Sequence, residues 1–163
     1  MRTNESVHAS PCRSHAADDA SEFLLNRLDR PTPRIALGHA LADIAHACID
    51  ISDGLLADVA HIARASGVGI EIDVDALPAS PVLIRTFDAA TRRRLQATGG
   101  DDYELCFTAP PGAAQAIHDA ARSAGVEVTR IGRVIDGPAT VRAIDADGME
   151  WRPAAQGYVH FGA

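Results

Sequence analysis

The sequence predicts a layered α/β or α+β domain in which a mixed sheet packs against helices. Strand-like and helix-like segments alternate along the chain, but hairpin-like pieces intrude, which favours this class over a purely doubly wound sheet. A length of 163 residues suits one domain with its own core. Hydrophobic residues make up 47% of the chain and charged residues 23%, as in soluble globular proteins.

Charge, cysteine usage and hydropathy exclude several classes of protein. The net charge of −7 argues against a protein that holds nucleic acid by neutralising phosphates, although metal ions can supply the positive charge that a bound nucleotide needs. Cys12, Cys48 and Cys106 are far apart and odd in number, which indicates a reducing compartment. No apolar stretch approaches the ~20 residues that span a bilayer, and no secretory signal is evident. We expect a cytoplasmic protein with no membrane or nucleic-acid partner.

The first part of the chain is expected to be a tail followed by two helices. Residues 1–20 are polar and aperiodic, which indicates a disordered or expression-dependent tail, so the domain proper is expected over residues 21–163. Residues 21–28 can form a short helix, and two prolines within 30–34 then break the chain. Apolar residues recur at helical spacing over 35–47.

The middle of the chain predicts a strand, a helix and a second strand. Residues 48–51 form a short apolar strand, and Ser52 is a plausible N-cap for a helix that runs through Ala65 and stops at Gly67. Residues 68–75 alternate cleanly, so we expect a half-buried strand whose acidic residues, including Glu71, face outward.

The remaining elements follow from turn residues and periodicity. They are expected as a helix over 82–96, a strand over 103–108, a helix over 113–124, a strand over 126–135 bent at Gly132, and a hairpin of 141–144 with 149–151 around Asp147 and Gly148.

Two carboxylates and a hydroxyl carry the strongest chemical signal. Asp50 lies in the predicted strand, while Ser52 and Asp53 begin the next helix, so the three side chains can converge on one rim. Hard cations such as Mg²⁺ prefer carboxylate oxygens, and backbone N–H groups at a helix start suit phosphate oxygens. A capped helix explains Ser52 and Asp53 equally well. It leaves Asp50 unexplained, since an acid in an apolar strand is costly unless it is paired or metal-bound.

A second acidic cluster, Gly-Gly-Asp-Asp-Tyr-Glu, occupies residues 99–104. Its glycines allow close approach of a ligand, although the segment is also compatible with an acidic turn before a strand. The run of three arginines at 92–94 is either a solvated face or a phosphate contact. Trp151 and Tyr158 are either core residues or platforms on which a flat ring stacks. The sequence contains no P-loop motif.

Five motifs in order resemble the C-terminal half of the thiamine-monophosphate kinase family, within the superfamily of aminoimidazole ribonucleotide synthetase and selenophosphate synthetase. They are Arg-Pro-Thr-Pro-Arg at 30–34, Ile-Asp-Ile-Ser-Asp-Gly-Leu at 49–55, Gly-Gly-Asp-Asp-Tyr-Glu-Leu at 99–105, Ile-Gly at 131–132 and Gly-Tyr-Val-His-Phe at 157–161. The resemblance implies the C-terminal domain of the aminoimidazole ribonucleotide synthetase-like fold.

The resemblance also implies an activity, its cofactors and its site residues. The activity is the ATP-dependent phosphorylation of thiamine monophosphate to thiamine diphosphate with Mg²⁺. Asp50 and Asp53 match Mg²⁺ ligands, and Ser52 matches an ATP contact. Asp101 matches a substrate-contacting acid that is often Glu in the family. Tyr158 matches an aromatic wall for the thiamine moiety.

Family members are roughly twice as long and begin with a domain that supplies further metal-binding acids, a glycine-rich phosphate segment and the dimer interface. We therefore expect this chain to be a C-terminal domain that is inactive alone and works with that N-terminal half in a homodimer. Two alternatives stay open: another member of the same ATP-binding superfamily, and a non-catalytic, free-standing α/β module.

Overall fold

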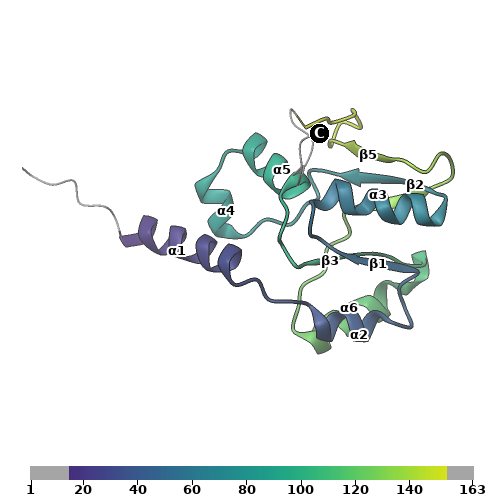
Figure 1. Cartoon of the computed structure of the whole chain (residues 1–163), viewed down its shortest axis with the longest axis horizontal. Coiled ribbons are helices and arrows are strands. Elements are labelled where there is room, and N and C mark those ends of the chain that lie inside the picture. Colours follow the sequence, from purple (N-terminus) through teal and green to yellow (C-terminus); the bar gives the residue numbers. More distant parts are fainter. Residues whose placement is uncertain (1–14, 154–163) are drawn as a thin grey trace, which may run out of the picture.

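Two small sheets with helices form the protein in the computed structural model, which describes residues 15–153 and the side chains from residue 22 onward (Figure 1). The helices are α1 (His15–Asp29), α2 (Ile35–Leu41), α3 (Leu55–Ser66), α4 (Pro81–Thr86), α5 (Ala89–Thr98), the 3₁₀ helix η1 (Pro111–Ala113) and α6 (Ala114–Ala124). The strands are β1 (Ala47–Asp50), β2 (Gly69–Asp73), β3 (Leu105–Thr108), β4 (Gly132–Ile135) and β5 (Val141–Ile144).

The larger sheet is mixed, as the sequence predicts. Its order is β4-β2-β5, with β2 antiparallel to β4 and parallel to β5. The smaller sheet is the antiparallel pair β1–β3. In Figure 1, α3 lies along the larger sheet, while α2 and α6 lie side by side beyond β1 and β3. No helix within residues 15–153 combines the length and the apolar character that a membrane span requires.

Two apolar clusters hold these layers together, and the β1–β3 pair lies between them. The first joins α3 to the larger sheet through buried residues that include Val59, Ile62, Ile70 and Ile72. The second joins α2 to α6 around Leu37 and Leu41. Alternate residues of the strand pair serve the two clusters, because successive side chains of a strand point to opposite faces: Ile49 and Cys106 pack on the first, and Leu105 and Phe107 on the second.

Several predicted helix and strand boundaries differ from the structure by more than the one or two residues by which element ends commonly vary. Helix α1 begins at His15, inside the segment expected as a tail, and residues 1–14 lie outside the described residues. The helix expected over 35–47 ends at Leu41. The one expected over 82–96 is two helices, because Phe87 is extended and the Asp88 side chain caps a new helix by accepting a hydrogen bond from the Thr91 N–H. Of the strand expected over 126–135, only Gly132–Ile135 is a strand.

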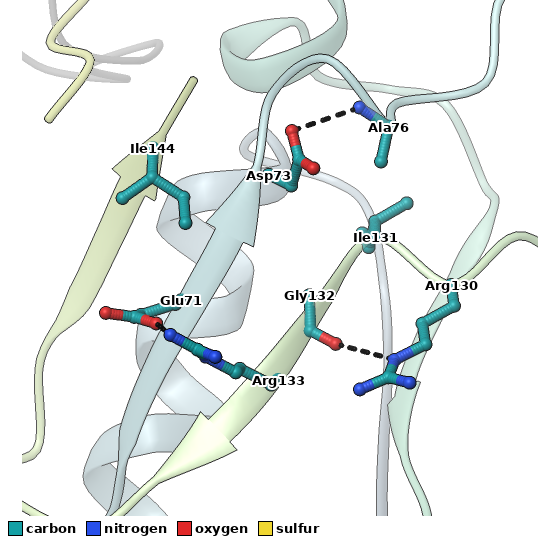
Figure 2. Close-up of a pocket in the computed structure, with 8 residues that line it drawn as sticks. All are labelled: Glu71, Asp73, Ala76, Arg130, Ile131, Gly132, Arg133 and Ile144. Atoms are coloured by element: carbon teal, nitrogen blue, oxygen red, sulfur yellow. Dashed lines mark hydrogen bonds and ion pairs between the residues drawn. The ribbon is translucent and has the colours of Figure 1, made fainter. Parts of the chain in front are cut away.

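Glu71 does not face solvent as predicted, since it is only 7% exposed at the centre of the larger sheet. It pairs in register with Arg133 on β4 and Arg142 on β5. Arg133 Nε donates to its carboxylate at 2.7 Å and Arg142 Nη1 at 3.2 Å, and Figure 2 shows the first of these contacts. The two long arginine side chains cover the carboxylate and replace the water that the sequence pattern led us to expect.

Replacing Glu71 by Ala is expected to lower the free energy of unfolding by about 1–2 kcal/mol, because two guanidinium groups lose their shared partner. The value is modest because the Arg133 and Arg142 side chains are 64% and 51% exposed and can be rehydrated. Urea unfolding of the variant checks this. The exposed Glu127→Ala change is the matched control, and equal stability of the two variants would contradict the role of Glu71.

Candidate functional site: two acidic loops joined by their backbones

The two acidic segments of the sequence lie side by side, and we call residues 50–54 and 99–104 the paired loops. They meet because β1 and β3 are antiparallel and Asp50 is opposite Leu105. Backbone hydrogen bonds extend the ladder past the strands. The Ile51 N–H donates to the Glu104 carbonyl at 2.9 Å and the Asp101 N–H to the Ser52 carbonyl at 2.9 Å, while the Tyr103 N–H donates to the Ile51 carbonyl at 3.2 Å. The loops therefore form one unit.

The close approach of the paired loops requires glycine. A Cβ on Gly100 would collide with the carbonyl oxygen of Ser52, and one on Gly54 would lie 2.8 Å from the carbonyl oxygen of Thr98, where Gly54 also has a φ of +111°. Asp101 and Tyr103 have φ angles of 60° and 54°, which are uncommon for residues with a side chain. Such backbone strain concentrates at functional sites.

Ser52 is not the N-cap of α3, which corrects the sequence-based prediction. The helix begins at Leu55, and its N-cap residue, Gly54, makes no side-chain cap. The buried carboxylate of Asp58, in the first turn of the helix, instead reaches back to the loop ahead of it. It accepts hydrogen bonds from the N–H groups of Ser52 at 3.0 Å and Asp53 at 3.1 Å. These two N–H groups are therefore occupied within the protein.

Asp58 was missed by the sequence analysis. It lies among the apolar residues that α3 buries, three positions after Leu55 and one before Val59, and is 2% exposed. The sequence does contain a signal for this role: an acidic residue stands among the apolar residues of the helix, shortly after the Ser52-Asp53 pair. A carboxylate in the first turn commonly reaches back to N–H groups ahead of the helix.

The proposed metal-binding residues lie on an accessible part of the site. Asp50 ends β1 and is exposed, Ser52 is exposed, and Asp53 is half-buried. No group of three or more His, Cys, Asp or Glu side chains within the described part of the chain is arranged to hold a metal ion. Two carboxylates still suit Mg²⁺, which usually takes one or two of them and completes its shell with water and phosphate oxygens.

Glu104 belongs to the second acidic cluster of the sequence, and it joins the paired loops to the N-terminal segment through arginine partners that the sequence did not indicate. Arg34 donates to it from Nε at 2.8 Å and from Nη2 at 2.6 Å, and Arg27 of α1 donates from Nη2 at 2.9 Å. The hydrogen bond to Glu104 raises the pKa of Arg34 further above its usual range. The Arg-Pro-Thr-Pro-Arg segment therefore not only interrupts the helical structure but also binds Glu104 through Arg34.

Asp102 has the clearest electrostatic perturbation within the paired loops. Desolvation by the surrounding chain, together with repulsion from Glu104, raises the pKa of Asp102 from 3.8 to about 6, although the residue as a whole is exposed, which weakens the effect of desolvation. Its neighbour Asp101, the predicted substrate-contacting residue, is exposed on the same loop. Titrating carboxyl groups with shifted pKa values are enriched at functional sites.

The other candidates in the sequence are structural or lie outside the described residues. Trp151 packs against the first apolar cluster and donates its backbone N–H to the Ala143 carbonyl at 2.8 Å, so it is a core residue. Arg93 forms an ion pair with Asp75, and Arg92 donates to the Phe87 carbonyl at 2.8 Å. Tyr158 lies outside the described residues.

A cavity of about 280 Å³ lies away from the paired loops, on the face of the larger sheet that carries Glu71. Figure 2 shows its lining, which includes Asp73, Arg130 and Arg133. Its charges are largely satisfied within the protein, because Glu71 pairs with Arg133, and Asp73 accepts hydrogen bonds from the N–H groups of Asp75 and Ala76.

Comparison with known proteins agrees with the fold. Residues 7–145 match the family described as AIR synthase related protein, C-terminal domain, and the chain belongs to this family. It is 46% identical over 144 residues to the thiamine-monophosphate kinase of Salmonella typhimurium, a match that covers 86% of the chain and 43% of the relative. The chain therefore spans less than half the length of that relative.

Solved structures give the same result. The thiamine-monophosphate kinase of Stenotrophomonas maltophilia superposes with a TM-score of 0.75 at 45% identity, over 84% of this chain and 41% of that one. A structure described as AaThiL complexed with AMPPCP and TMP superposes with a TM-score of 0.67 at 31% identity, over 96% of this chain and 44% of that one.

Replacing Asp102 by Asn is expected to raise the stability of the protein at pH 7 and not at pH 3. A carboxyl group whose pKa is raised to about 6 in the folded state binds more protons there than in the unfolded chain, so its contribution to stability falls as the pH rises from about 4 to 6. Solvent screening limits the gain to about 1 kcal/mol. Thermal unfolding across this pH range checks it against the exposed Asp136→Asn control. A constant difference at every pH would contradict the titration of Asp102.

Proposed function

We propose that the chain is the C-terminal part of an ATP-dependent kinase that phosphorylates thiamine monophosphate to thiamine diphosphate. The observation that carries the proposal is the joining of the two acidic loops within a domain that is 46% identical to a thiamine-monophosphate kinase. In phosphoryl transfer, the protein contributes mainly alignment and neutralisation of charge, and little covalent chemistry. Two loops fixed to one another suit that task.

Asp50 and Asp53 would hold Mg²⁺ in this proposal, and Ser52 would contact ATP. The bound metal supplies positive charge that neutralises phosphate oxygens, which matters in a chain with a net charge of −7. Asp101, on the opposite loop, would contact the thiamine substrate. The Asp101 N–H bonds directly to the Ser52 carbonyl, so the proposed nucleotide and substrate contacts are neighbours along one hydrogen-bonded path.

The proposed substrates are ATP and thiamine monophosphate. The chain would work together with a further domain, of the kind that makes the relatives longer, and the whole enzyme would be a cytoplasmic homodimer. A description of a related structure names AMPPCP and TMP together, which supports a ternary complex with both substrates. The competing function is a free-standing module without catalysis. The 46% identity to a thiamine-monophosphate kinase over 86% of the chain favours the kinase.

The proposal is tested by fusing this chain behind the remaining part of the Salmonella typhimurium relative and measuring thiamine diphosphate formation from ATP and thiamine monophosphate. We expect turnover from the fusion and none from the chain alone. Asp50→Asn and Asp53→Asn should each lower the rate at least roughly a hundredfold, because each removes a charged oxygen that Mg²⁺ prefers. Excess Mg²⁺ should restore part of the loss.

The exposed Asp136→Asn change in the same fusion is the matched control and should retain the parent rate. If both site variants also retain it at low Mg²⁺, the carboxylates do not bind the metal. Consumption of ATP that does not depend on thiamine monophosphate would favour another member of the superfamily.

Tyr158→Ala in that fusion should raise the KM for thiamine monophosphate roughly tenfold and leave the KM for ATP nearly unchanged, while Tyr158→Phe should be silent. The reason is that a stacked ring contributes about 0.5–1.5 kcal/mol beyond burial of area. Steady-state kinetics with each substrate varied in turn measures both constants. A large loss of thermal stability with an unchanged KM would instead identify Tyr158 as a core residue.

A further inference from the structure

We infer that Asp58 is a positioning residue whose buried carboxylate fixes both paired loops in the arrangement that the site needs. The inference rests on the proposed function for its consequence in binding, but its structural part stands independently. Asp58 is 2% exposed. Its Oδ2 atom accepts hydrogen bonds from the N–H groups of Ser52 at 3.0 Å and of Asp53 at 3.1 Å.

The burial of Asp58 excludes a direct role in binding. A group that is 2% exposed cannot reach a ligand on the surface without leaving the core. Removing a carboxylate from water is costly, so its retention requires strong partners. The two N–H groups provide them, and the first turn of α3 adds favourable partial charge. The side chain is therefore held rigidly, and it holds the Ser52–Asp53 backbone in turn.

The effect of Asp58 extends to the second loop through the backbone of Ser52. The Ser52 N–H donates to Asp58, while the carbonyl of the same residue accepts the Asp101 N–H at 2.9 Å. Ser52 is thus bonded on both sides, inward to the helix and outward to the opposite loop. Gly100 lies so close to the same carbonyl that a Cβ there would collide with it. Release of Ser52 by loss of Asp58 would consequently loosen Asp101 as well as Asp53.

A role confined to the stability of α3 makes a different prediction. In that case a change at Asp58 would weaken the helix and the core residues Val59 and Ile62 together, and both loops would follow only through global unfolding. A positioning role predicts a local effect, in which the amides of Ser52, Asp53 and Asp101 lose protection while those of Val59 and Ile62 keep theirs. Hydrogen exchange resolves the two because local opening and global unfolding are separable.

The test uses this chain as it stands, with Asp58→Asn as the variant and Asp136→Asn as the matched control. Asparagine has the same shape but no charge, so its bonds to the two N–H groups are weaker. We expect amide exchange at Ser52, Asp53 and Asp101 to accelerate at least tenfold. We also expect Mn²⁺, used as a paramagnetic probe, to broaden the amides around Asp50 and Asp53 at a metal concentration roughly tenfold higher than in the parent chain.

Unchanged exchange at the three loop amides of the variant would overturn the inference, as would equal acceleration at Val59 and Ile62. Unchanged Mn²⁺ broadening despite faster loop exchange would overturn its consequence for binding. If Mn²⁺ does not broaden these amides even in the parent chain, the proposed metal site fails, and the exchange data alone decide the role of Asp58. If Asp58→Asn does not fold, the role of Asp58 is tested in the parent chain. We then measure scalar couplings across the two hydrogen bonds, between the Ser52 and Asp53 nitrogens and the Asp58 carboxyl carbon. Absence of these couplings would overturn the inference.

Discussion

The antiparallel pairing of β1 with β3 is the constraint on which the rest of the structure depends. The pair lies between two apolar clusters, and its side chains alternate between them, so neither strand can shift by one residue without exchanging the two faces. This fixed register sets Asp50 opposite Leu105 and brings together loops about fifty residues apart in the sequence. Hydrogen bonds from Ile51, Asp101 and Tyr103 then continue the pairing into the site itself.

Carboxylates in this protein fall into two groups with different surroundings. Asp58, Glu71 and Glu104 are held by fixed donors, namely two backbone N–H groups in the first case and pairs of arginines in the others. Glu71 and Glu104 join elements that are distant in the sequence, whereas Asp58 joins α3 to the loop directly ahead of it. The carboxylates of Asp50 and Asp101, by contrast, lie at exposed positions on the paired loops. The protein thus stabilises its frame with one set of acids and presents another set at its surface.

The sequence was sufficient for features that depend on local patterns. Alternation over 68–75 predicted β2. Helical spacing and the presence of Gly67 predicted most of α3 and its end, where Gly67 adopts a left-handed conformation. It was insufficient where a distant partner decides the outcome. Nothing near Glu71 in the sequence indicates that Arg133 and Arg142 cover it, because their proximity arises from sheet pairing.

The start of α3 was mispredicted for a similar reason. A serine followed by an acid resembles an N-cap, but the loop ahead of the helix instead pairs with residues 101–104, which holds Ser52 out of the cap position. Asp58 then satisfies the N–H groups that a conventional cap would leave to solvent or ligand. The acidic motifs could therefore be identified from the sequence, whereas the residues that hold them in place could be identified only from the structure.

The glycine contacts between the paired loops also have a mechanical consequence. A Cβ on Gly100 would collide with the Ser52 carbonyl, so the loops can approach closely only because glycine stands there, and the hydrogen bonds from Asp101 and Tyr103 to Ser52 and Ile51 would have to break for the loops to separate. Loops joined in this way form one continuous surface, so a ligand bound there would be enclosed by a second surface that covers both loops at once.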